Sequence, residues 1–289
     1  MRTLSEDQWL GLKRAHEDFV MPWMEGYRAR RARRESHPVH DFLFGYYQTN
    51  RQTLTCWRPM ADMLLLGDRA KELFLGDPRY CEEKGGVRLC IESMDAREIQ
   101  RADWVSKLLE QALGRPARFS CFGLHEWAMV YKSDEIRHEK TPLRVSKEKI
   151  EEVVEGLSIC CTHHDAFRFF TPEAIPLNSL QPRSDERHLN EQFGCVHFNM
   201  DLYRWSYKLS PWIGSALITD CFKLAIEARA LDMRASPYDV SSFGYEAIMI
   251  ETAEGREQYR REQREIYEKG QPLARRLLEE CRRLTAIAV

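Results

Sequence analysis

Apolar residues recur at helical spacing through most of the chain, and this periodicity constrains the fold more than any other feature. After Ser5, the residues Trp9, Leu12, Phe19 and Trp23 fall on one side of a helix. Similar helical patterns cover 95–113, 146–155, 196–209, 211–234 and the charged C-terminal segment. Runs suited to short strands occur at 81–91, 157–161 and 244–251. The sequence therefore predicts a mainly α fold, a single compact helical domain with a few short β-strands.

Local residue types indicate where some of these helices begin and end. Ser5 and Gln8 have the types and spacing of a capping box. Ser210-Pro211 has the types of a cap and a first helical turn, so we expect the next helix to begin there. Gly270 to Pro272 should break the C-terminal helix, since both residues disfavour a helix interior.

The chain organisation favours one domain over residues 1–289. It has no internal repeat, no low-complexity tract and no linker-like stretch. Residues 51–80 are expected to be helix and loop, and the polar segment 178–193 a surface loop. Residues 1–35 are expected to form a basic N-terminal helix, with five arginines near its end: Arg28, Arg30, Arg31, Arg33 and Arg34.

Composition excludes several classes of protein. Lys plus Arg number 43 and Asp plus Glu 45, so the net charge is -2 and any nucleic-acid site must be a local basic patch. No apolar run approaches the roughly 20 residues of a membrane helix. The N-terminus lacks the apolar core of a signal peptide, and the nine cysteines contain no CxxC pair. We expect reduced thiols and a cytoplasmic protein that contacts no membrane.

Ionisable residues lie inside aromatic, apolar sequence at four places: HPVHDFLFGYY, GLHEWAMVY, CTHHDAFRFF and VHFNMDLYRWSYKL. Seven of the nine histidines fall in or beside them: His37, His40, His125, His138, His163, His164 and His197. Charged groups are rarely buried unless they are paired or used. We therefore expect the four segments to converge on one pocket.

The predicted helix at 196–209 has a polar face made of His197, Asp201, Arg204, Trp205 and Lys208. An acid, a base and a cation beside an indole ring are groups that can contact a bound substrate. An internal salt bridge between Asp201 and Arg204 or Lys208 explains the same pattern equally well.

The segment HHDAFRF places Asp165 and Arg168 three residues apart among phenylalanines. An aromatic wall beside a carboxylate can hold a flat base and put the acid under its sugar. A buried Asp–Arg ion pair is the competing interpretation.

Weaker candidates lie elsewhere. His125 and Glu126 can serve as a base and an acid in an apolar wall, and His37 and His40 with Asp41 can bind a metal. The arginines near the end of the N-terminal helix can contact phosphates or can be a solvated face.

Common catalytic motifs are absent. The sequence has no GxGxxG, GxxxxGK[ST], GxSxG or HExxH, no zinc-deaminase PCxxC and no helix–hairpin–helix glycine motif. His164-Asp165, with His upstream and Asp downstream, loosely permits an HD-type metal phosphohydrolase.

Five segments together resemble bacterial proteins carried under the name 3-methyladenine DNA glycosylase: HPVHDFLFGYY, FGLHEWAMVY, THHDAFRFFTPEAIPLN, GCVHFNMDLYRWSYKL and LDMRASPYD. The similarity runs from about residue 36 to about residue 280. The resemblance implies a DNA glycosylase that cleaves the N-glycosidic bond of a flipped-out modified base in double-stranded or single-stranded DNA.

Base release passes through an oxocarbenium-like state that a carboxylate can stabilise. Asp201 is our first choice for this carboxylate, Asp165 the second and Glu126 the third. His164 and His197 are candidates to orient water or to protonate the leaving base.

The residues expected to hold the base or a phosphate are Phe167, Arg168, Asn199, Arg204, Trp205, Lys208 and His125. No cofactor and no metal ligand are assigned. Because these groups are so polar, the base is either alkylated or a bulky hydroxyl-bearing phage base such as glucosylated hydroxymethylcytosine, in repair or in anti-phage defence. A metal-dependent phosphohydrolase or oxygenase and a non-catalytic nucleic-acid-binding protein are the alternatives.

Overall fold

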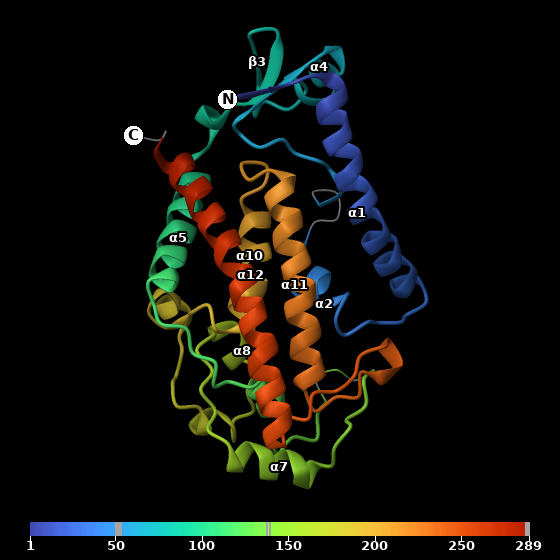
Figure 1. Cartoon of the computed structure of the whole chain (residues 1–289), viewed down its shortest axis with the longest axis vertical. Coiled ribbons are helices and arrows are strands. Elements are labelled where there is room, and N and C mark those ends of the chain that lie inside the picture. Colours follow the sequence, from blue (N-terminus) through green and yellow to red (C-terminus); the bar gives the residue numbers. More distant parts are fainter. Residues whose placement is uncertain (50–53, 137, 139, 287–289) are drawn as a thin grey trace.

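Three helices form the centre of the molecule: α10 (Val196–Lys208), α11 (Ser215–Ala235) and α12 (Ala253–Ala286). The structure is a computed structural model, and it describes residues 1–49, 54–136, 138 and 140–286. Helix α11 packs against both α10 and α12. In Figure 1, α5 (Ala96–Leu113) runs along one side of this group and α1 (Glu6–Ala32) along the other. The most apolar long helix, α11, is therefore central, because a helix that is apolar on more than one side is buried.

A small four-stranded sheet lies at the end of the molecule where both termini are found (Figure 1). Its strands are β1 (Arg2–Leu4), β2 (Met63–Leu66), β3 (Tyr80–Glu83) and β4 (Gly86–Leu89), in the order β1-β2-β4-β3. Strand β1 is parallel to β2, and the other pairs are antiparallel. The β3–β4 hairpin turns at Lys84 and Gly85, whose φ angles of 48° and 78° suit a tight I′ turn.

Shorter helices joined by long loops lie around the helical group, with α7 at the end opposite the sheet (Figure 1). They are α2 (Phe42–Gly45), α6 (Leu124–Ala128), α7 (Lys147–Gly156), α8 (His164–Phe167) and α9 (Arg187–Asn190). Helix α4 (Asp68–Phe74) packs on the sheet instead. The described residues also form four 3-10 helices: Ile91–Ser93, Ile175–Leu177, Ser184–Glu186 and Ser241–Phe243.

The mainly α fold class is confirmed, and so are several helix ends. Ser5 and Gln8 form the expected capping box of α1, and Ser146 caps α7 by accepting the N–H of Lys149. Among the described helices, none is both long and apolar enough to cross a membrane.

The expected start of α11 is wrong. The Ser210-Pro211 bond is cis, and the helix begins at Ser215. Ser215 donates its N–H to the carbonyl of Arg58 and its Oγ accepts the N–H of Arg58, at 3.0 and 2.8 Å. A contact with a distant segment therefore fixes this helix end.

Three strand assignments also need correction. Residues 157–161 form no strand, and Ile159 makes an isolated bridge with Asn178. Residues 244–251 are irregular, because their backbone bonds to helix ends: the N–H of Ile248 donates to the carbonyl of Arg234. Conversely, 51–80 contains strand β2, which pairs with β1 from the start of the chain.

Helix α12 continues through Gly270 and Pro272, so the expected break is wrong. The glycine serves packing, because a Cβ there would lie 1.9 Å from Asn199 Oδ1 on α10. Only glycine allows α12 to approach α10 this closely.

Candidate active site

A narrow cavity joins all four segments that the sequence singled out. Its walls come from Phe42 and Tyr46, Glu126 and Met129, Asp165, Ala166 and Phe169, and His197, completed by His138 and Arg229. Its volume is about 30 Å³, which is room for one or two water molecules and too little for a base. The expected convergence is confirmed.

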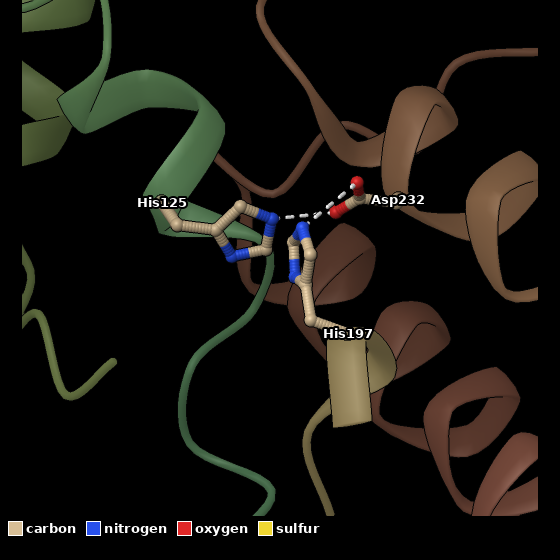
Figure 2. Close-up of side chains that lie close together, drawn as sticks. All are labelled: His125, His197 and Asp232. Atoms are coloured by element: carbon tan, nitrogen blue, oxygen red, sulfur yellow. Dashed lines mark hydrogen bonds and ion pairs between the residues drawn. The ribbon is translucent and has the colours of Figure 1, made fainter. Parts of the chain in front are cut away.

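Part of the cavity wall belongs to a buried group of ionisable side chains, which we call the Asp232 cluster: His125, Glu126, His197, Arg229 and Asp232. Helix α11 supplies Arg229 and Asp232 from successive turns, α6 supplies His125 and Glu126, and α10 supplies His197. His125 Nε2 lies 2.6 Å from Asp232 Oδ1 (Figure 2). Arg229 Nη1 donates to Asp232 Oδ2 at 2.5 Å and to Glu126 Oε1 at 2.7 Å.

Charges of opposite sign keep this cluster ionised. Burial would raise the pKa of Glu126, but Arg229 outweighs it and holds that pKa well below the usual value. Burial likewise opposes the charge of His125, yet Asp232 raises its pKa well above the usual value. The two carboxylates are therefore balanced by one guanidinium and one imidazolium.

His197 differs from its neighbours in the cluster. Burial, together with the charge of His125, lowers its pKa to about 3, so its ring is neutral near pH 7. Its Nδ1 is buried without a hydrogen-bond partner, and its Nε2 lies 3.8 Å from Asp232 Oδ2.

A second group of charges lies nearer the surface, and we call it the Asp165 cluster: His163, Asp165, Arg187, Glu191, Asp201 and Arg204. Asp165 accepts from Arg187 Nη2 at 2.5 Å and from Arg204 Nη1. The same Arg204 nitrogen lies 3.3 Å from Asp201 Oδ2. The two favoured carboxylates thus share one counter-ion, and the expected ion pair between Asp201 and Arg204 is confirmed.

The remaining members of the Asp165 cluster enclose Asp201. His163 Nε2 lies 3.3 Å from Asp201 Oδ2, and Arg187 Nη1 lies 3.3 Å from Glu191 Oε1. Burial would raise the pKa of Asp165, but Arg187 and Arg204 hold it well below the usual value. Asp165 is therefore an anion throughout the neutral range.

Three imidazoles connect the two clusters. The His197 ring stacks on that of His163, with centroids 5.4 Å apart, and meets the His125 ring edge-on at 4.4 Å. The polar groups therefore form one continuous network from Asp232 to Arg204.

A basic hollow of about 480 Å³ lies on the surface beside the Asp165 cluster, lined by Tyr46, Tyr47, Gln48, Arg168, Arg204, Tyr207 and Lys208. This volume falls in the range of small-ligand sites, about 300–1,000 Å³. Arg204 and Lys208 lie 4.5 and 5.7 Å from the centre of the Trp205 ring, which supports both cations. Three cationic side chains, Arg168, Arg204 and Lys208, thus line this hollow.

A second hollow, of about 300 Å³, shares Phe42 and His138 with the narrow cavity. The proposed metal group of His37, His40 and Asp41 lies beside it with its atoms engaged elsewhere. His37 Nδ1 accepts the N–H groups of Val39 and His40, at 3.2 and 3.1 Å. Asp41 accepts from Arg30, so the geometry does not favour an ion here.

The other expected site residues divide into two groups. Arg168 lines the basic hollow, and its Nε lies 3.4 Å from Asp165 Oδ1. His164 Nδ1 lies 3.5 Å from the same oxygen. Asn199 instead donates to the carbonyls of Phe193 and Cys195. Phe167 packs on Phe170 with ring centroids 5.1 Å apart, so neither Asn199 nor Phe167 lines the hollow or the narrow cavity.

Sequence reasoning missed four charged members of the clusters: Arg187, Glu191, Arg229 and Asp232. The expected surface loop at 178–193 is wrong where it forms α9 and buries Arg187 and Glu191, which are 7% and 0% exposed. Arg229 and Asp232 were detectable, because an i,i+3 ion pair in an apolar helix predicts a buried pair.

Two groups of three side chains within the described ranges can hold a metal ion: His125, His197 and Asp232, and His163, Glu191 and Asp201. In each group the ligand atoms lie within 4.8 Å of one another.

A scan against protein-family models and searches of curated proteins and of solved structures find no match to this chain.

Proposed function

We propose that the protein is a DNA glycosylase in which Asp165 stabilises the sugar cation formed as the base departs. One observation carries the proposal: Asp165 lines the water-sized cavity and is bonded to Arg204, a wall residue of the basic hollow. A permanently ionised carboxylate between a water and a substrate pocket suits a reaction through an oxocarbenium-like state.

The geometry favours Asp165 over Asp201, which reverses the order drawn from the sequence. Asp201 is 1% exposed and lines neither the hollow nor the cavity. Its shared contact with Arg204 gives it the role of a positioning residue. Glu126 lines the cavity but accepts from Arg229, and it does not line the basic hollow.

The basic hollow supplies the contacts that a flipped nucleotide requires. Arg168 and Lys208 can hold phosphate oxygens, and the rings of Tyr46 and Tyr207 can stack on a base. The hollow has room for an alkylated purine or for a larger hydroxyl-bearing base, in repair or in antiviral defence. His164, beside Asp165 and partly open to solvent, is placed to protonate the leaving base.

The proposal is tested by measuring base release from DNA that carries a defined modified base. Plain DNA, DNA with alkylated purines and DNA with glucosylated hydroxymethylcytosine are incubated with the full-length protein. Free base is measured by mass spectrometry and abasic sites by alkaline cleavage. We expect release from one modified DNA, and a loss of about 10²–10³ in kcat for Asp165→Asn. Asp134→Asn, which alters a fully exposed carboxylate, is the matched control.

Other outcomes of this assay contradict the proposal. Strand cleavage without free base would favour a metal-dependent phosphohydrolase. Salt-dependent DNA binding with intact DNA in every sample would favour a non-catalytic binding protein.

A further inference from the structure

His197 is a buried imidazole whose hydrogen-bonding capacity is unused. Its residue is 7% exposed, its Nδ1 has no partner, and its Nε2 is 3.8 Å from Asp232 Oδ2. Buried polar atoms are normally satisfied, so Nδ1 calls for a partner such as a water. The other ring nitrogen, Nε2, faces Asp232 (Figure 2) at more than hydrogen-bond distance, and it is the nitrogen that can bind an ion between them. The ring also lines the narrow cavity, so a ligand in that cavity can reach it.

The surroundings of His197 have the chemistry of a metal site. His125, His197 and Asp232 come from three different helices, and their ligand atoms lie within 4.8 Å of one another. All three side chains meet at one point in Figure 2. Ligand atoms that share one ion, each about 2.0–2.2 Å from it, lie roughly 3–4 Å apart. The three ligand atoms, all within 4.8 Å of one another, are compatible with this spacing, and the 2.6 Å between His125 Nε2 and Asp232 Oδ1 opens slightly when an ion replaces the shared proton.

We propose that His125, His197 and Asp232 bind one divalent transition-metal ion of the zinc class. Two imidazole nitrogens and one carboxylate oxygen suit zinc or cobalt, whereas calcium and magnesium prefer oxygen ligands alone. Three protein ligands leave a fourth position free. The adjoining cavity, with about 30 Å³, is large enough for the water that would occupy it.

The charges around Asp232 accommodate such an ion. Arg229 donates to Asp232 Oδ2, so the other carboxylate oxygen, Oδ1, is the one that would bind the metal. In the structure, Oδ1 is hydrogen-bonded to His125. Glu126 pairs with the same guanidinium and offsets its positive charge. A divalent ion that displaces the proton of His125 therefore changes the charge of the cluster by one unit.

The second candidate group is less suited to an ion. Arg187 contacts both of its carboxylates, with Nη1 3.3 Å from Glu191 and 3.8 Å from Asp201. Arg204 contacts Asp201 as well. Two guanidinium groups already occupy the positions from which these carboxylates would reach a cation.

The test measures metal binding without DNA, so its result is independent of the proposed base release. Full-length protein is stripped with a chelator, dialysed against Zn²⁺ or Co²⁺ and analysed for bound metal. We expect about one ion per chain, and at least a 100-fold weaker affinity in His197→Gln and in Asp232→Asn. His163→Gln, which alters the other candidate group, is the matched control and should keep the ion.

A second measurement guards against variants that fold poorly. Far-UV circular dichroism checks each variant, and Zn²⁺ should raise the Tm of the wild type but not of His197→Gln. Wild-type protein that takes up no ion overturns the proposal. Retention of the ion by His197→Gln, or its loss in a folded His163→Gln, also overturns it, because the ion would then lie elsewhere.

Discussion

The Asp232 cluster and the Asp165 cluster are made of the same kinds of side chain but differ in their access to solvent. Arg229 and Asp232 are both 0% exposed, and one guanidinium serves two carboxylates there. In the Asp165 cluster two guanidinium groups form ion pairs with three carboxylates. One of these groups reaches the surface, because the side chain of Arg204 is 19% exposed. Enclosure favours fixed geometry, whereas a charged network that reaches the surface can contact a substrate.

The difference also predicts where the clusters contribute to stability. Removing one partner of an enclosed ion pair leaves a charge without compensation, which is strongly destabilising. The same change near solvent allows water to replace the lost partner. Stability should therefore depend more on the Asp232 cluster and activity more on the Asp165 cluster.

The largest expected effect is that of Arg229→Met. The change leaves Glu126 and Asp232 buried without their shared cation, so the free energy of unfolding should fall by about 3–5 kcal/mol. Arg204→Met should lower it by only about 1 kcal/mol, because Arg187 still neutralises Asp165. Urea denaturation of both variants measures the two values. Equal losses would erase the distinction between the clusters.

Gly270→Ala probes the contact that fixes α10, the helix that contributes to both clusters. The added Cβ would meet Asn199 Oδ1 at 1.9 Å, so α10 or α12 must shift, at a cost of about 1–3 kcal/mol. Gly11→Ala in α1 is the control, because nothing lies within 4 Å of its added Cβ. That variant should be more stable by about 0.5–1 kcal/mol. A neutral Gly270→Ala, measured by thermal unfolding, would show that the close approach is not required.

The basic hollow should contribute to DNA affinity without contributing to stability. Lys208→Gln should weaken binding similarly for all sequences and reduce the slope of log K against log salt by about 1. Lys269→Gln, which removes an exposed lysine from α12, is the control. Fluorescence anisotropy at several salt concentrations measures the slopes. Unchanged slopes in Lys208→Gln would place the DNA on another surface.

The smallest expected effect lies outside both clusters, at His37. Burial, with the charges of His40 and Arg30, lowers the pKa of His37 to about 4, against about 6.5 when unfolded. The unfolded chain therefore binds the proton first, and the free energy of unfolding falls as pH decreases from 6.5 towards 4. Because His37 is half-buried, we expect only about 1 kcal/mol.

His37→Asn isolates this contribution from the titration of the two clusters. Asparagine does not titrate. Its side-chain oxygen can accept the two N–H groups that now donate to His37 Nδ1. Urea denaturation between pH 7 and 4.5 should give a shallower dependence for the variant. Parallel curves would assign the acid sensitivity to other groups.

The sequence predicted features that depend on neighbouring residues along the chain. The capping box at Ser5 and the polar face with His197 and Asp201 follow from helical spacing alone, and both are present. The convergence of four polar segments followed from the high cost of burying isolated charges.

Features that depend on distant partners were not predictable in the same way. Strand β2 pairs with β1 on one side and β4 on the other, and the residues near Met63 do not reveal these partners. The segment with Arg187 and Glu191 has a surface-like composition, and contacts with distant partners bury it: its ion pairs with Asp165 and His163 and its packing on α5. Gly270 resembles a helix breaker until Asn199 is placed against it.

Arg204 has one further consequence, because the same guanidinium lines the hollow and neutralises Asp165 and Asp201. A phosphate that enters the hollow competes with both acids for its N–H groups. Phosphate binding in the hollow and the charge compensation of the two carboxylates would therefore be thermodynamically linked, because a phosphate that takes Arg204 leaves Asp165 with Arg187 as its counter-ion.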